Sequence, residues 1–430
     1  MMTRTAALLA IALPVAANAQ TYRLLDLGTL GGSTSNALGI NSHGVVVGSS
    51  TTAGGLTHGF VFSGGSMQDI GTLGGTASTA RGINDSGVIV GDADTGDNHD
   101  HAFIYDGATM QDIGTLAGVT SEAFAINNSG GVVGTSSTST VNVFHAISYS
   151  NGVLSDLGTL PGGDFSYANS VNDSGIVVGN SNNSVQTEKG FIYQNGAMSD
   201  IGTLPNTNMC NALQINASGQ VAGFSYTASL GEDAWIKSGG VFTDLGSLGG
   251  DKTWAYGLND LGQVVGGSYV NSTDYHGYLY SGGTIHDLNS MLDASGAGWT
   301  VLSCRGINDG GQIAASATFA GGQMHAVLLT PVPEPSALLV SAAGIALLLL
   351  RGFTCTRLGT LRRSAAVCRS SSAEANPGWL PGTASGKRAE EQTSLGISTR
   401  AVSARGVAAC PASANGCPSG QVEGPSRLGS

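Results

Sequence analysis

The sequence predicts an all-β fold, a seven-bladed β-propeller, and three observations support this prediction. The motif DLGTLGG at residues 26–32 occurs seven times with small changes, at intervals of 43 or 44 residues. This interval is typical of propeller blades and solenoid units. Each interval holds four short apolar segments separated by turn motifs. The repeat region also begins with a fourth segment, residues 21–30, that has no first three segments before it. The last unit has its first three segments but no fourth.

Turn chemistry identifies the four segments as β-strands. In the second period they are residues 80–84, 87–91, 101–105 and 110–116. An Asn-x-x-Gly motif between the first two segments suits a type I turn. A Gly-Gly, Asn-Gly or Asp-Gly dipeptide between the last two is typical of two-residue hairpins. Each unit is therefore predicted to be an antiparallel four-stranded meander.

The first strand of each unit is expected to lie at the centre of the ring, where the blades converge. Four residues before each turn asparagine stands a small residue, namely Ala37, Ala80, Ala123, Ala168, Ala212, Ala255 or Cys304. The fourth strand carries the recurring aspartate and is expected at the outer edge. Residues 21–30 would then supply the fourth strand of the last unit, whose own segments end at residues 325–332. Closure removes open sheet edges, whereas a linear β-solenoid, the alternative, would not need this exchange.

The chain divides into four predicted parts. Residues 1–19 combine Arg4, a short apolar core and an Ala-Asn-Ala cleavage site, which is typical of a secretory signal peptide. The protein is therefore expected to be exported. Residues 20–331 are predicted to be the propeller, residues 332–351 an anchor segment, and residues 352–430 a disordered tail, which a translated read-through would explain.

Charge and cysteine content exclude two classes of protein. The chain holds 17 Lys+Arg against 29 Asp+Glu, a net charge of −12. Because so few cations cannot displace many counterions from phosphates, no nucleic-acid partner is expected. Only Cys210 and Cys304 lie between the signal peptide and residue 331, which excludes a disulfide scaffold.

Three motifs recur in fixed order and resemble the HAF repeat of bacterial extracellular proteins over roughly residues 22–330. They are His-Ala-Phe, Asp-Leu-Gly-Thr-Leu and Gly-Ile-Asn. The resemblance implies a location outside the cytoplasm rather than an activity. The histidines of the first motif are His58, His101, His145, His276 and His325, and Lys189 and Asp233 replace them in the fourth and fifth units.

A second resemblance covers the end of the anchor segment. Pro333, Glu334 and Pro335, an apolar run at residues 336–350 and Arg351 are similar to a PEP-CTERM sorting signal of Gram-negative bacteria. This resemblance implies a membrane helix and an exosortase as processing partner. Fifteen apolar residues span about 22 Å, less than a bilayer core, which suits a transient anchor. An ordinary C-terminal membrane anchor is the alternative, and the long tail departs from the signal's usual pattern.

The recurring histidines and aspartates are predicted to be structural. A catalytic group is needed once, whereas histidine stands in five of the seven units. A hydrogen bond to a backbone group or to the recurring aspartate explains it more simply. These aspartates are Asp26, Asp69, Asp112, Asp156, Asp200, Asp244 and Asp287.

One acidic stretch breaks the repeat. DADTGDNHDH places Asp92, Asp94, Asp97 and Asp100 at what we take to be loop spacing, and their hard oxygen atoms are suitable Ca²⁺ ligands. The stretch lacks the downstream glutamate and the glycine of an EF-hand loop. A solvated acidic loop is the favoured interpretation, and no cofactor is expected.

The loops between the second and third strands are the variable parts of the repeat. They are rich in Ser, Thr, Asn, Asp and Tyr, and Trp254, Phe165 and Tyr167 lie nearby, which suits an extracellular polysaccharide as partner. Polar loops that simply face water are an equal alternative. We therefore expect a non-enzymatic surface protein, a structural or binding component of a polysaccharide matrix. The alternative is a polysaccharide lyase or glycosidase, which needs a carboxylate pair that the sequence does not reveal.

Overall fold

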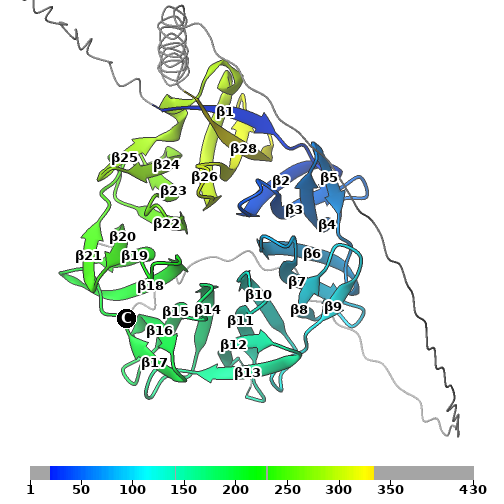
Figure 1. Ribbon diagram of the computed structural model, residues 1–430, viewed down its shortest axis with the longest axis vertical. Helices are drawn as coiled ribbons and strands as arrows, with labels where there is room; N and C mark the ends of the chain where they lie inside the picture. The colour runs from blue at the N-terminus through cyan, green and yellow to red at the C-terminus, as the bar shows by residue number, and fades with distance from the viewer. Residues whose placement is uncertain (1–19, 141, 229–230, 334–430) are drawn as a thin grey trace, which may run out of the picture. The chain divides into compact units, whose positions relative to one another are not determined.

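The computed structural model describes residues 20–140, 142–228 and 231–333. These residues form seven four-stranded antiparallel sheets around a common centre (Figure 1), so the predicted seven-bladed β-propeller is confirmed. The predicted signal peptide, the disordered tail and the anchor segment from Glu334 onward lie outside the described residues. Within the described residues, no helix is long and apolar enough to span a membrane.

Each blade runs from an innermost to an outermost strand in chain order, except the seventh. Blade one has β2 (Gly31–Ile40), β3 (Val46–Thr52), β4 (Thr57–Ser63) and β5 (Ser66–Asp69). Blade two has β6 (Gly74–Ile83), β7 (Ile89–Thr95), β8 (Asp100–Tyr105) and β9 (Met110–Asp112). Blade three has β10 (Ser121–Ile126), β11 (Val132–Ser137), β12 (Phe144–Ser150) and β13 (Val153–Gly158). Blade four has β14 (Ser166–Val171), β15 (Val177–Asn182), β16 (Glu188–Gln194) and β17 (Ala197–Asp200).

Blades five to seven complete the ring. Blade five has β18 (Thr207–Ile215), β19 (Val221–Thr227), β20 (Glu232–Ser238) and β21 (Val241–Asp244). Blade six has β22 (Thr253–Leu258), β23 (Val264–Tyr269), β24 (Tyr275–Ser281) and β25 (Thr284–Asp287), and two short 3₁₀ helices follow it, η1 (Leu288–Met291) and η2 (Ala294–Gly296). Blade seven has β26 (Trp299–Ile307), β27 (Ile313–Phe319), β28 (Met324–Val332) and, from the start of the chain, β1 (Thr21–Asp26).

The first strand of the chain closes the ring. β1 pairs antiparallel with β28, with Leu24 opposite Leu329, and the two strands lie side by side in Figure 1. Tyr22 and Leu24 are buried in the core of blade seven. The predicted closure is confirmed, and the linear solenoid is excluded. β28 runs one residue past the predicted domain boundary at 331, because Val332 still pairs with Thr21.

The turns explain the regular strand lengths. In blade two, Gly87 ends the Asn-x-x-Gly turn with φ +81°, a left-handed conformation that favours glycine. Five of the six predicted outer hairpins have both central residues at positive φ, as in Asn151-Gly152. The hairpin at Asp106 differs, because only Gly107 has positive φ there. The Asp106 side chain instead accepts hydrogen bonds from Ala108 N and Thr109 N, which stabilises a longer turn.

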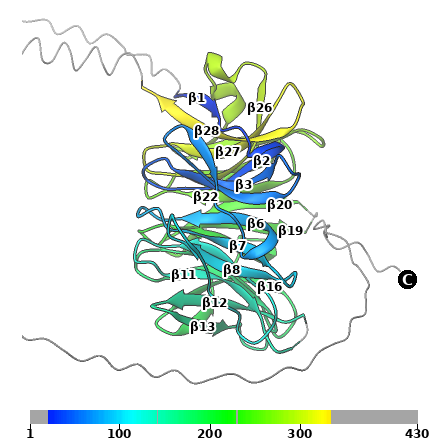
Figure 2. The ribbon, with the colours of Figure 1, turned by 90° about the vertical axis from the view of Figure 1, so that its right-hand side faces the viewer.

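The small residue predicted on each first strand is fully buried, as Ala80 shows with no exposed surface. In six blades it faces a glycine of the second strand, as Ala80 faces Gly91, where a Cβ atom would clash with the Thr79 carbonyl; in blade seven Cys304 faces Ala315. Large side chains of the third strands, such as Phe103, fill the core. The core is a series of clusters within and between neighbouring blades, and Figure 2 shows the ring of blades from the side.

The propeller has two distinct faces. The blade-to-blade crossovers lie beside the loops between second and third strands, as the bridges from Leu30 to Thr52 and from Leu73 to Thr95 show. We name this side the crossover face. The Asn-x-x-Gly turns and the outer hairpins lie at the opposite ends of the strands, on the turn face.

Candidate functional site in the central channel

A central channel runs between the two faces, and the first strand of every blade lines it. Cavities of about 250, 220 and 180 Å³ follow the channel from the turn face to the crossover face. The two ends differ in their chemistry, and this difference identifies the candidate site.

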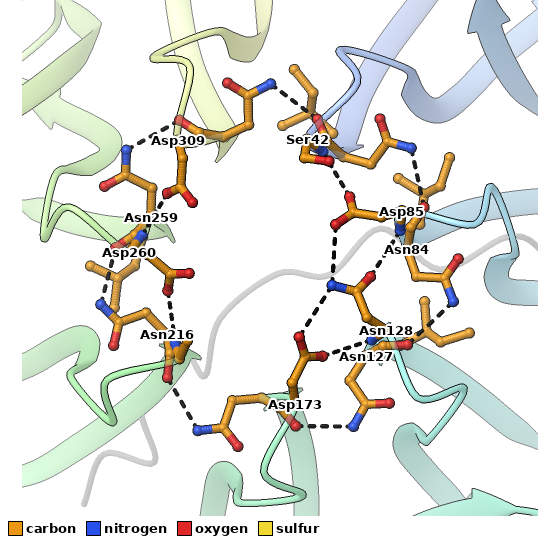
Figure 3. Close-up of a pocket in the computed structure, with 18 of the residues that line it drawn as sticks. Ser42, Asn84, Asp85, Asn127, Asn128, Asp173, Asn216, Asn259, Asp260 and Asp309 are labelled. Atoms are coloured by element: carbon orange, nitrogen blue, oxygen red, sulfur yellow. Dashed lines mark hydrogen bonds between the residues drawn. The ribbon is translucent and has the colours of Figure 1, made fainter. Parts of the chain in front are cut away.

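At the turn face, a closed ring of asparagine side chains joins the blades (Figure 3). Asn84 Nδ2 donates to the Asn127 carbonyl at 3.2 Å, and Asn308 Nδ2 donates across the seam to the Asn41 carbonyl at 3.0 Å. The same bond recurs at every junction between blades, so the described residues form seven such bonds, whose donors are Asn41, Asn84, Asn127, Asn172, Asn216, Asn259 and Asn308.

The residues that follow these asparagines form a second set of links. Ser42 N donates to Asp85 Oδ1 at 3.0 Å, and Asp85 N donates to Asn128 Oδ1 at 2.9 Å. Asn128 Nδ2 also lies 3.1 Å from Asp85 Oδ2 and 3.2 Å from Asp173 Oδ2. Because protein donors from neighbouring blades already use these carboxylates, the turn face is a structural junction.

On the crossover face, four equivalent positions meet at each junction between two blades. The first position is on the first strand, three residues before the turn asparagine. The second and third positions are one residue on the second strand and one on the third strand of the same blade. The fourth position is on the first strand of the next blade, five residues before its turn asparagine. We name each group of four an inter-blade seat. From seat 1/2 to seat 7/1 these groups are Leu38, Ser49, Thr57 and Thr79; Arg81, Asp92, Asp100 and Glu122; Phe124, Thr135, Phe144 and Tyr167; Asn169, Asn180, Glu188 and Asn211; Leu213, Phe224, Glu232 and Trp254; Tyr256, Gly267, Tyr275 and Ser303; and Arg305, Ser316, Met324 and Asn36.

The seats differ in chemistry although the surrounding scaffold repeats. Alanine or cysteine precedes the channel-facing residue in every blade, yet that residue is Leu38 in one blade, Arg81 in the next and Phe124 in the third. A ring that needed only stability would gain nothing from such variety. The crossover end of the channel is therefore the candidate functional site.

Seat 2/3 holds a partly buried ion-pair network. The Arg81 guanidinium pairs with the Asp92 carboxylate and, at 2.9 Å, with Glu122 Oε2. The guanidinium also lies 5.4 Å from the centre of the Phe124 ring. Burial raises the pKa of Asp92 and of Glu122 above their usual values, although the charge of Arg81 opposes the shift.

This network changes the interpretation of the acidic stretch in blade two. We took it for a loop, but β7 extends to Thr95 and holds Asp92 and Asp94. Successive residues on one face of a strand are about 7 Å apart. Three of the aspartates have partners of their own: Asp92 binds Arg81, Asp94 accepts from Thr76, and Asp97 accepts from the Thr95 hydroxyl. Among the described residues, no three His, Cys, Asp or Glu side chains are placed to hold a metal ion. The loop interpretation is therefore wrong for Asp92, Asp94 and Asp100, which lie on β7 and β8, and this placement gives no support to a Ca²⁺ site formed by Asp92, Asp94, Asp97 and Asp100.

Three residues of seats 5/6 and 6/7, Trp254, Tyr256 and Tyr275, form a cluster with Tyr269 of β23. We name these four residues the aromatic wall. The Trp254 ring lies 6.5 Å from Tyr256 with 7° between the planes, and 5.7 Å from Tyr275. The Arg305 guanidinium lies 4.0 Å from the centre of the Tyr256 ring. All four residues are partly exposed, so each retains surface that a ligand can contact.

Polar contacts fix this wall in place. Trp254 Nε1 donates to one carboxylate oxygen of Glu232, and Lys252 Nζ lies 2.9 Å from the other. Gly267 allows the Tyr275 ring to lie across β23, because a Cβ atom there would clash with the Tyr275 hydroxyl. Trp254 is therefore held by a hydrogen bond, and Gly267 leaves the space that the Tyr275 ring occupies.

Seat 4/5 contains a carboxylate without a cation. Asn169 Nδ2 donates to Asn180 Oδ1 at 2.8 Å, and Asn180 Nδ2 donates to Glu188 Oε1 at 3.0 Å. In the described part of the chain, Glu188 forms no ion pair. Burial raises the pKa of Glu188 above its usual value.

The recurring histidines and aspartates lie outside the channel, on the outer strands. Each histidine places Nδ1 within 2.7 to 3.1 Å of the aspartate of the same blade, in the pairs His58–Asp69, His101–Asp112, His145–Asp156, His276–Asp287 and His325–Asp26. The aspartates also accept a backbone N–H two residues further on, as Asp200 and Asp244 do in the blades that lack histidine. These contacts support the structural interpretation.

Two of the three predicted aromatic residues, Trp254 and Tyr167, lie in the seats. The sequence prediction missed Arg81, Glu122 and Glu188. The sequence does contain a signal for them. When the seven repeats are aligned, the positions that they occupy change from unit to unit, whereas the turn asparagine is constant.

Comparison with family models and with curated proteins gives no match. Among solved structures, YCF48 bound to a D1 peptide is 11% identical and has a TM-score of 0.46, with 74% of this chain and 99% of that chain covered. A gluconolactonase from Xanthomonas campestris is 10% identical, with 74% and 96% covered and a TM-score of 0.35. The Aleuria aurantia lectin is 10% identical, with 70% and 97% covered and a TM-score of 0.32. Likeness at this level says nothing about activity.

Proposed function

We propose that this protein binds a glycan chain on the crossover face of its propeller and acts, without catalysis, as a structural or binding component of an extracellular polysaccharide matrix. One observation carries the proposal. The scaffold repeats seven times, whereas the seats at the crossover end of the channel present a partly exposed aromatic wall beside carboxylate, amide and guanidinium groups.

This combination suits a polyol. The apolar faces of sugar rings pack against indole and phenol rings, which bury a large area and still offer a polar edge. A few fixed polar groups then orient the ligand. Asn169, Asn180 and Arg305 are placed to supply such contacts, because they line or adjoin the channel mouth.

Export and sorting belong to the same proposal. A matrix role requires the signal peptide at residues 1–19 to direct export. It also requires retention at the envelope, for which we propose the sorting motif of Pro333, Glu334, Pro335 and Arg351, with an exosortase as processing partner. Cell fractionation tests this part. Replacement of Glu334 by alanine should change the amount of protein retained in the envelope, and an unchanged distribution would contradict sorting by this motif.

Binding is tested by calorimetry against a panel of neutral and charged oligosaccharides. Trp254→Ala should weaken binding at least about tenfold, the cost of losing one stacking contact of about 1.4 kcal/mol. Trp299→Ala is the matched control, because Trp299 is also a half-buried first-strand tryptophan but packs against Phe319 and His325, away from the wall. Equal losses in both variants would contradict a site at the aromatic wall.

A propeller enzyme is the second candidate, and seat 2/3 favours it. Asp92 and Glu122 are two neighbouring carboxyl groups whose pKa values burial raises, as general acids require. Their ion pairs with Arg81 favour a structural role instead. Incubation with the same oligosaccharides, followed by detection of new reducing or unsaturated ends, separates the two candidates. Turnover that Glu122→Gln abolishes would establish the enzyme.

A further inference from the structure

We infer that seat 4/5 recognises a primary ammonium group, so that the glycan bound on the crossover face contains unacetylated amino sugars. This inference rests on the proposed function and names the class of ligand. It depends on Glu188, its fixed position and its lack of a cationic partner.

The Glu188 carboxylate is held in place on one side only. Asn169 Nδ2 contacts both Asn180 Oδ1 at 2.8 Å and the Ala212 carbonyl of the next blade at 2.9 Å. Asn180 in turn donates to Glu188 Oε1 at 3.0 Å. In the described part of the chain, Oε2 accepts no hydrogen bond and is not among the buried polar atoms without a partner. One oxygen is therefore fixed, and the other remains available to a donor.

Among the described residues, Glu188 and Asp100 are the seat carboxylates that form no ion pair, whereas Asp92 and Glu122 share Arg81 and Glu232 pairs with Lys252. Asp100 is exposed to water, but Glu188 is partly buried. A partly buried carboxylate without a cation costs free energy. A ligand cation that meets Glu188 would offset this cost, whereas a uronate would add repulsion.

Two tyrosines adjoin seat 4/5. Tyr167 lies opposite Asn180 in the sheet of blade four, and the Tyr226 side chain forms a hydrogen bond with Asn211. Burial raises the pKa of both tyrosines, and the charge of Glu188 contributes to each shift. A cation bound at Glu188 would therefore lie in a site that already carries negative charge, which attracts an ammonium ion.

Calorimetry with three oligosaccharides of equal length tests the inference in the full chain: a glucosamine oligomer, its N-acetylated form and a glucose oligomer, at about pH 6, where a sugar amine carries its proton. The native protein should bind the glucosamine oligomer at least about tenfold more tightly than the other two. Glu188→Gln, which can still accept from Asn180, should remove this preference and leave the neutral oligomers unaffected.

Asp97→Asn is the control. Asp97 is an exposed residue of the loop between β7 and β8, on the crossover face but outside the seats, and its replacement removes the same charge. This variant should keep the preference. A preference that survives Glu188→Gln would overturn the assignment to this seat. Equal affinity of the native protein for all three oligomers would overturn the ammonium inference and leave glycan binding standing. Failure to bind any oligomer would overturn the proposed function as well.

Discussion

Replacement of Asn84 by alanine tests whether the asparagine ring holds neighbouring blades together. Asn84 Oδ1 accepts from Ser86 N at 3.1 Å and from Val88 N at 3.0 Å, while Nδ2 donates to the Asn127 carbonyl at 3.2 Å. The residue is only 5% exposed. The alanine variant therefore leaves three backbone groups without their partner in a place that water reaches poorly.

Each lost hydrogen bond costs about 1 kcal/mol, and a buried group left unsatisfied costs more. The expected loss is about 3 kcal/mol in the free energy of unfolding. Asn183→Ala is the matched control, because Asn183 Oδ1 accepts from Val185 N and Thr187 N, both at 3.1 Å, in the same kind of turn. Asn183 is partly exposed and, within the described residues, its amide makes no bond to another blade. We expect a loss of about 2 kcal/mol there, because two hydrogen bonds are lost.

Urea unfolding of the full chain, followed by tryptophan fluorescence and by circular dichroism, measures both variants. The midpoint should fall further for Asn84→Ala, with the slope of the transition unchanged. The difference of about 1 kcal/mol then measures the bond between blades. If both variants unfold at the same urea concentration, the ring of asparagines adds nothing to local turn stability and our reasoning is wrong.

Three further predictions follow from the site and the core. Gly267→Ala should displace the Tyr275 ring, lower glycan affinity about tenfold by calorimetry and cost about 1 to 3 kcal/mol in stability; unchanged affinity would count against the aromatic wall. Because the folded-state pKa of Glu188 is raised above its unfolded value, its ionised form costs stability above that pKa, and the cost disappears as pH falls. Glu188→Gln should thus melt at a higher temperature than the native protein at about pH 7 and at the same temperature near pH 3, and a lower temperature at pH 7 would contradict an uncompensated charge. Burial raises the pKa of Cys210 to about 12 and that of Cys304 further, so peptide mapping after iodoacetamide treatment at about pH 8 should find both thiols unlabelled in the native protein and labelled in urea.

The blade architecture could be predicted because its signals are local. A turn such as Asn84 to Gly87 needs a residue that tolerates positive φ at one place, and this need repeats in every unit. The unpaired strand at residues 21–30 then determines the ring, since its register with β28 follows from the same repeat. The errors arose where a neighbouring side chain overrides the repeat, as at Asp106.

The candidate site could not be predicted in the same way. Arg81 and Glu122 are 41 positions apart, and each looks like an ordinary polar residue on a strand edge. They become an ion pair only because the third blade packs against the second. Glu188 is distinguished by what it lacks, and the absence of a cation can be recognised only when its neighbours in space are known.

The seam between β1 and β28 determines how the ring responds to mechanical load. Thr21 pairs with Val332, and five more pairs follow to Asp26 and Val327. The first residue of β1 and the last residue of β28 therefore lie at the same end of this antiparallel pair. A pull applied at these two residues opens the pairs one at a time, as in unzipping, rather than shearing all six together. Tension would therefore peel β1 away at low force while the junctions between the other blades bear none of it. Seat 4/5, on the far side of the ring, would be among the last parts to feel the load.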